Sequence, residues 1–102
     1  MAMLHTVNKS PFERTTLESC LAHVQPGASV ILFEDGVYGA LKGSNVAGRV
    51  QDAMGDCKVY ALGPDIKARG IDESNLIDGI QVVDYAGFVG LAAECDKVQA
   101  WL

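Results

Sequence analysis

Two hydrophobic patterns alternate along this chain, continuous apolar runs and segments with helical spacing. Strand-like runs occupy residues 2–7, 28–36, 57–62 and 80–84. A run that lacks regular polar alternation is typical of a strand covered on both faces, as in a parallel sheet. The sequence KVQAWL at residues 97–102 is expected to add a short edge strand.

The first helix is predicted from a strong start signal. The segment SPFE at residues 10–13 offers a capping serine, a proline suited to the first helical position and a glutamate that completes a capping box. We expect this helix to run to about Val24 and to stop before the turn residues Pro26 and Gly27.

Further helices are expected at residues 38–41, from Val46 onward, at 66–69 and at 85–94. Asp84 is the expected N-cap of the last one. Its apolar stripe is predicted to comprise Tyr85, Phe88, Val89 and Ala92. Strands that alternate with helices predict an α/β fold with a mostly parallel, four- to five-stranded sheet and helices on both faces.

Length and charge narrow the class of protein. The 102 residues predict one domain spanning residues 1–102, and the 49% apolar content predicts a substantial core. A net charge of -5, with no basic cluster, argues against direct nucleic-acid binding. The N-terminal run is too short for a signal peptide and no run is long enough to span a membrane, so we expect a cytoplasmic protein with no membrane partner.

Several common chemistries of small α/β domains lack their motifs here. GxGxxG and GxxxxGK[ST] are absent, so no phosphate loop is predicted. His5 and His23 have no Cys or carboxylate at metal-ligand spacing. We predict His5 as a hydrogen-bonded structural residue, and Glu34-Asp35 as a strand-end turn rather than an acidic pocket.

The cysteines are the remaining candidate nucleophiles. Cys20, Cys57 and Cys95 are far apart and form no CxxC pair. Cys20 shares a helical stripe with Leu17 and Leu21, which favours a core position. The nearby sequence supplies no clear means of lowering its pKa, so a reactive Cys20 would need a partner subunit to complete its environment.

Five segments together resemble one known family. They are LHTVNKSPF (4–12), LFEDGVYGAL (32–41), YALGPDIKARG (60–70), VVDYAGFVGL (82–91) and VQAWL (98–102). In order and over nearly the whole chain, they resemble the DsrH/TusB family. The LHT start, the D-x-x-ARG segment and the AWL end are specific only in combination.

The resemblance implies a DsrE-like fold and a subunit of a cytoplasmic sulfurtransferase complex. It implies DsrE-like and DsrF-like sister subunits in a heterohexamer, and persulfide sulfur passed to a small DsrC/TusE-like acceptor protein. No cofactor or metal is implied, and no catalysis by this chain alone is expected.

Cys20 matches a first-helix cysteine of DsrH-type members, which implies a candidate sulfur-relay thiol and favours the branch that oxidises stored sulfur. Two alternatives stay open. One is a TusB-like subunit of the relay for 2-thiouridine in tRNA. The other is a purely structural subunit in which Cys20 only packs. Trp101 is expected either to anchor an interface or to close the domain's own core.

Overall fold

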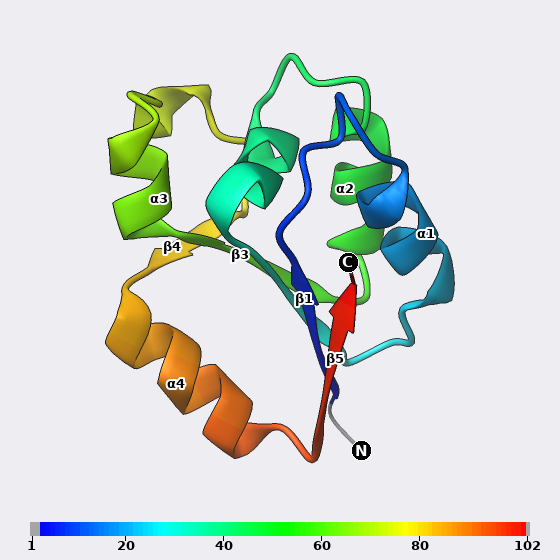
Figure 1. Ribbon diagram of the computed structural model, residues 1–102. Helices are drawn as coiled ribbons and strands as arrows, with labels where there is room; N and C mark the ends of the chain where they lie inside the picture. Colours follow the sequence, from blue (N-terminus) through cyan, green and yellow to red (C-terminus); the bar gives the residue numbers. More distant parts are fainter. Residues whose placement is uncertain (1–2, 102) are drawn as a thin grey trace.

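In the computed structural model, which describes residues 3–101, five strands form one sheet in the order β4-β3-β2-β1-β5 (Figure 1). The strands are β1 (Met3–Val7), β2 (Ser29–Leu32), β3 (Lys58–Leu62), β4 (Gln81–Val83) and β5 (Lys97–Trp101). Every pairing between them is parallel, so the predicted parallel sheet is confirmed, and the predicted edge strand at the end of the chain is β5.

The helices divide between the two faces of this sheet, as predicted (Figure 1). They are α1 (Thr16–His23), α2 (Ala47–Ala53), α3 (Gly63–Ala68) and α4 (Tyr85–Glu94), with 3-10 helices η1 (Glu34–Ala40) and η2 (Glu73–Asn75). The chain steps from β1 through β2 and β3 to β4, then returns across the sheet to β5. Because parallel crossovers are right-handed, this reversal places α4 on the face opposite α1 and α2.

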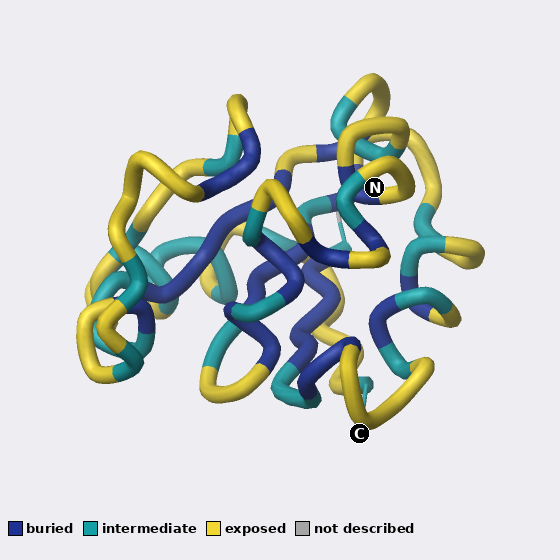
Figure 2. The backbone as a smooth tube through the Cα atoms, turned by 90° about the horizontal axis from the view of Figure 1, so that it is seen from above, coloured by how far each residue is buried: buried dark blue, intermediate teal, exposed yellow. Residues whose placement is uncertain are grey.

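The two faces carry apolar cores of unequal size. The larger core lies under α1 and α2 and includes Val7, Val30 and Val59. The smaller one consists of Leu4, Ile31 and Tyr60, against which α4 packs partly buried side chains. Figure 2 shows that buried residues concentrate in the central strands, whereas the C-terminal part of the chain is mostly exposed. The α4 face is therefore the less completely covered side of the sheet.

The predicted start of the first helix is wrong, because the SPFE segment forms a turn. The Ser10 carbonyl accepts hydrogen bonds from the N–H groups of Glu13 and Arg14, at 3.2 and 3.0 Å. The Ser10 hydroxyl accepts one from the Phe12 N–H at 3.1 Å. Capping groups thus satisfy a single turn that does not continue, and α1 begins only at Thr16.

Other boundaries differ by a few residues. The strand predicted at 28–36 ends at Leu32, and the chain enters η1 instead of a later short helix. The helix predicted at 66–69 begins already at Gly63, with Pro64 in its first turn. The helix from Val46 is confirmed as α2, for which Val46 is the N-cap residue.

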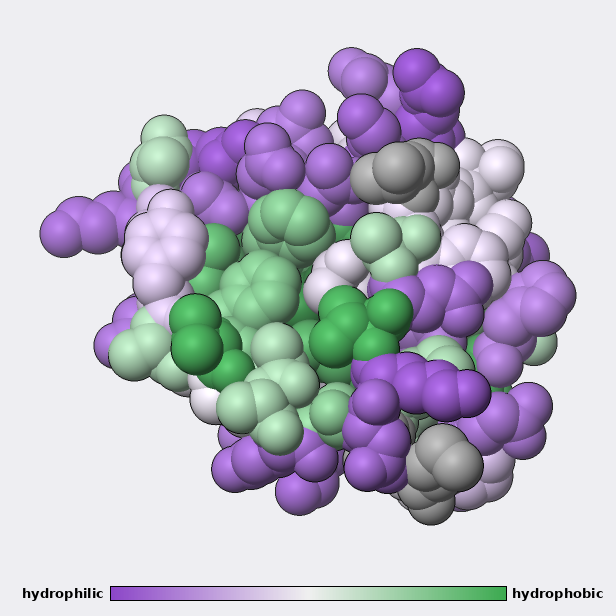
Figure 3. Space-filling model, turned by 60° about the horizontal axis from the view of Figure 1, so that its bottom comes forward, coloured by the Kyte–Doolittle hydropathy of each residue, from purple (hydrophilic) through white to green (hydrophobic). Residues whose placement is uncertain are grey.

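The bounds of α4 are predicted correctly, and its buried face is predicted in part, because Phe88 and Ala92 pack on the sheet as expected. Asp84 caps it as expected, accepting the Gly87 N–H at 2.8 Å. Tyr85 and Val89, however, are 61% and 68% exposed. The packed side is the arc that contains Phe88 and Leu91, since apolar residues cover more of this helix than the sheet can bury. Figure 3 shows apolar side chains gathered on this face of the molecule.

Candidate functional site

Cys20 lies in the last turns of α1, on the side that faces the larger core. Its side chain is 0% exposed, and Leu17 beside it is 1% exposed. Leu21 and Val24 pack against the same core while staying partly accessible. The stripe predicted from the sequence is therefore the core-facing side of α1, and Cys20 lies at its most buried part.

This environment keeps the Cys20 thiol protonated. Burial raises its pKa to about 12, and the neighbouring Cys57 adds a smaller effect in the same direction. A thiolate is the nucleophilic form of cysteine, and a thiol with this pKa is almost entirely protonated near neutral pH. In the described chain Cys20 has neither the access nor the charge of a reactive thiol.

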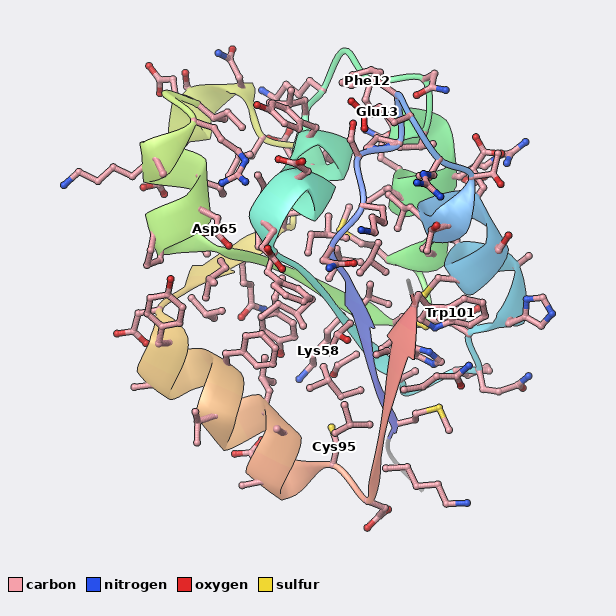
Figure 4. The ribbon with its side chains drawn as sticks, viewed as in Figure 1. Phe12, Glu13, Lys58, Asp65, Cys95 and Trp101 are labelled. Atoms are coloured by element: carbon pink, nitrogen blue, oxygen red, sulfur yellow. The ribbon has the colours of Figure 1, made fainter. Side chains whose placement is uncertain are left out.

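The other two thiols are also unactivated. Cys57 precedes β3, is 7% exposed and donates a hydrogen bond from its sulfur to the Gln25 carbonyl at 3.3 Å. Burial raises its pKa. Cys95 follows α4 on the opposite side of the sheet (Figure 4), where burial and then the carboxylates of Glu94 and Asp96 raise its pKa. Sequence reasoning gave neither thiol a role, and the described environments give none.

The D-x-x-ARG segment forms a polar network at the carboxyl ends of β2 and β3. Arg69 donates from Nε and Nη2 to one Asp35 oxygen at 3.1 and 2.9 Å. The Glu34 N–H donates to Asp65 Oδ2 at 2.6 Å. The hydrogen bond between Arg69 and Asp35 is the largest cause of the raised pKa of Arg69. The network joins η1 to α3, which gives these residues a structural task.

Glu34 also adopts a backbone conformation that is unusual for a residue with a side chain. Its φ is +49°, in the left-handed region. The Asp65 hydrogen bond holds its N–H, and Asn8 Nδ2 donates to the Glu34 carboxylate at 3.4 Å. The predicted strand-end turn at Glu34-Asp35 is therefore present as the first turn of η1, held on both sides.

The two ends of the chain meet through a pair of aromatic side chains. Trp101 Nε1 donates to His5 Nδ1 at 2.9 Å, which confirms His5 as a hydrogen-bonded residue. Trp101, labelled in Figure 4, also lies near His23 of α1, with ring centroids 5.7 Å apart. Trp101 is partly buried against the larger core, as one of its two predicted roles requires.

Two further features were sought among residues 3–101, a group of metal-ligating side chains and a helix able to span a membrane. Between residues 3 and 101, no cluster of three or more His, Cys, Asp or Glu side chains could hold a metal ion. None of the helices in that range has the length and apolar character that a bilayer-spanning segment needs.

Solved structures share this architecture at low sequence identity. The ychN protein from E. coli superposes with a TM-score of 0.85 over 99% of both chains, at 18% identity. A protein of unknown function from Methanobacterium thermoautotrophicum superposes with a TM-score of 0.75 over 96% of this chain and 97% of its own, at 17% identity. These likenesses confirm the predicted DsrE-like α/β class.

The chain belongs to the DsrH-like family, whose model, described as "DsrH like protein", matches residues 9–98. Curated relatives carry the name Protein TusB. The one from Pectobacterium carotovorum is 35% identical over 99 residues, covering 97% of this chain and all of the relative. The one from Escherichia coli K12 is 33% identical over the same length. The predicted resemblance to the DsrH/TusB family is thus confirmed.

Proposed function

We propose that this chain is a TusB-like subunit of a cytoplasmic sulfur-relay complex that serves 2-thiouridine formation in tRNA. The observation that carries this proposal is the full-length similarity, at 33–35% identity, to proteins named TusB. Membership of the DsrH/TusB family supports a place in a sulfur-relay complex with sister subunits. The branch that oxidises stored sulfur, our first expectation, has weaker support.

The described environments of the three thiols support a role in assembling the complex rather than in catalysis. Each cysteine pKa is raised, and burial is the first cause in each case. A subunit that holds no activated nucleophile contributes by placing its partners' reactive groups. Sulfur would then pass between a sister subunit and a TusE-like acceptor while this chain holds the assembly together.

The exposed apolar residues of the C-terminal segment support the same part. Tyr85, Val89 and Val98 are 61%, 68% and 53% exposed, and we call this set the α4–β5 surface. Large exposed apolar side chains are typical of surfaces that another protein covers. Sister subunits are the partners that the family suggests for this surface.

A DsrEFH-like role in sulfur oxidation is the second candidate, and Cys20 is the residue that favours it. Relay through Cys20 requires its thiolate to attack the outer sulfur of a donor persulfide. The donor S–S bond breaks, the donor leaves as a thiolate, and a new S–S bond forms on Cys20. That step needs a deprotonated and accessible Cys20, whereas the described thiol is buried with a pKa of about 12.

Deleting the gene in its own host, with two readouts, tests the proposed pathway. We expect loss of 2-thiouridine from tRNA, measured by mass spectrometry of nucleosides, and unchanged oxidation of stored sulfur. Restoring the intact gene should restore the modified nucleoside. Normal 2-thiouridine together with halted sulfur oxidation would overturn the TusB-like proposal and establish the second candidate.

The role of Cys20, so far a prediction, is tested in the complex reconstituted with its sister subunits. After exposure to a persulfide donor, intact-mass measurement reports whether this chain gains a sulfur atom. From the burial of Cys20 we expect none, while a sister subunit is loaded. A sulfur adduct that Cys20→Ala abolishes and the control Cys57→Ala retains would make Cys20 a relay thiol.

A further inference from the structure

A cavity of about 360 Å³ lies beside the edge strand β5, between β1 and the loop that follows α1. Six of its lining residues bear on its chemistry: His5, His23, Gln25, Lys97, Gln99 and Trp101. Its volume falls within the range of small-molecule sites, which are mostly apolar with a few polar groups. Nothing in the sulfur-relay proposal uses it.

His5 supplies a hydrogen-bond donor that has no partner among the described residues. Its Nδ1 accepts the Trp101 N–H at 2.9 Å, so the ring proton of the neutral imidazole lies on Nε2. Burial lowers the pKa of His5, which keeps the ring neutral. Nε2 makes no hydrogen bond among residues 3–101 and is not one of the unpartnered polar atoms sealed from solvent in that range, which agrees with the place of His5 in the cavity lining. This N–H is therefore available to donate to an acceptor bound in the cavity.

The charge around the cavity favours an anion. Lys97 lines it, and no Asp or Glu of the described residues does, although the chain as a whole carries a net charge of -5. His23 adds a second imidazole, held in place because its Nδ1 donates to the Ser19 carbonyl at 2.7 Å. The described lining is thus locally basic in an acidic protein, which is the complement of a carboxylate.

The walls of the cavity favour an anion that carries an aromatic ring. The Trp101 ring centroid lies 6.1 Å from that of His5 and 5.7 Å from that of His23, and both ring pairs are tilted. Met3 and Pro26 complete an apolar wall. A flat ring can stack against such side chains with its charged group directed toward Lys97.

We propose that this cavity binds a small aromatic carboxylate. The carboxylate accepts the hydrogen bond of His5 Nε2 and is neutralised by Lys97, while its ring packs against Trp101. The inference rests on the described cavity alone and stands or falls separately from the sulfur-relay proposal.

Tryptophan fluorescence of the 102-residue chain provides a direct measurement, because Trp101 is the chain's single tryptophan. Phenylacetate is titrated against phenylacetamide, its uncharged analogue of the same shape. We expect a saturable change with phenylacetate and binding of the amide weaker by about tenfold, since a charge-assisted contact is lost. Equal binding of the two, or no saturation with either, would overturn the proposal.

A pair of lysine variants locates the charge that binds. Lys97→Gln removes the cavity's lysine, and Lys58→Gln removes another exposed lysine, which lies outside the cavity at the start of β3. Only the first is expected to weaken phenylacetate, by about tenfold. Amide shifts in NMR spectra should cluster at Met3, Gln25 and Gln99. Shifts centred elsewhere, or equal effects of both variants, would contradict the assignment.

Discussion

At the residue scale, the pairing of His5 with Trp101 makes one buried imidazole sensitive to acid. Its Nδ1 must stay unprotonated to accept the Trp101 N–H. Burial lowers the pKa of His5 from its ordinary value of 6.5. Protonation of His5 in the folded chain therefore breaks a hydrogen bond and places a charge in a desolvated site. Neither cost applies in the unfolded chain.

This sets the direction of a pH dependence. Between the folded and unfolded pKa values of His5 the unfolded chain binds more protons, so the free energy of unfolding falls as the pH falls below about 6.5. The stabilisation is complete above that pH and is lost toward the lower, folded pKa. We expect the wild type to lose more stability than His5→Gln from about pH 7 to about pH 5, measured by urea unfolding.

The exposed His23 supplies the control for that measurement. His23→Gln removes the chain's other imidazole and should retain the wild-type slope. If both variants and the wild type lose the same free energy over this range, His5 does not carry the acid sensitivity.

The sequence predicts the environment of some of these residues better than that of others. The burial of Cys20 follows from its helical stripe, and the need of His5 for a partner follows from its place in a strand. Its partner could not be predicted, because Trp101 lies 96 residues away and only the sheet order brings them together. The cavity beside them was missed for the same reason.

At the element scale, two glycines differ in how much stability a Cβ added at their position would cost. A Cβ on Gly36, in η1, would collide with the Val7 carbonyl at the end of β1. A Cβ on Gly48, in α2, would meet nothing within 4 Å. The close approach at Gly36 packs η1 against the sheet, since the Phe33 N–H also bonds the Val7 carbonyl at 3.1 Å.

Alanine at the two positions should have opposite effects. Gly36→Ala is expected to lower the free energy of unfolding by about 1–3 kcal/mol, because backbone must shift. Gly48→Ala is expected to raise it by about 0.5–1 kcal/mol, through the better helix propensity of alanine. Chemical denaturation of both variants beside the wild type measures the difference. A neutral Gly36→Ala would show that η1 can move away from β1 at no cost.

Element boundaries were predictable where local capping and sheet packing agree. The Asp84 cap fixes α4 correctly, because its side-chain bond coincides with the start of a helix that packs on the sheet. The capping signal at Ser10 was equally plausible, but it stabilises a turn, and α1 begins only at Thr16. The local sequence does not specify where α1 must begin in order to pack on the sheet. Tertiary packing overrides the local signal there.

At the scale of the whole molecule, the uneven cover of the sheet points to association. The face under α1 and α2 holds the larger core, whereas the α4–β5 surface leaves three large apolar side chains exposed. A sister subunit that covered this surface would complete the second face. Binding would then remove apolar area from water without altering the chain's own core.

A charge placed on this surface should block assembly while sparing the fold. Val89→Glu puts a carboxylate at a position that is 68% exposed, so the free energy of unfolding should change by no more than about 0.5 kcal/mol. Association with the sister subunits should weaken by tenfold or more, because a buried unpaired charge costs several kcal/mol. Size-exclusion chromatography of the mixed subunits measures it.

Gln51→Glu, which adds the same charge at an exposed position of α2, is the matched control and should assemble normally. If Val89→Glu also assembles normally, partners bind elsewhere on the chain.

The place of β5 also constrains how the protein is made. β1, formed from residues 3–7, has β2 on one side and β5, formed from residues 97–101, on the other. A nascent chain can pair β1 with β2 early, but the second ladder of β1 must wait until nearly all of these residues have left the ribosome. Until then, β1 is an open edge that another chain could pair with. Folding is thus completed by the last strand, a non-local step that is slow by its topology.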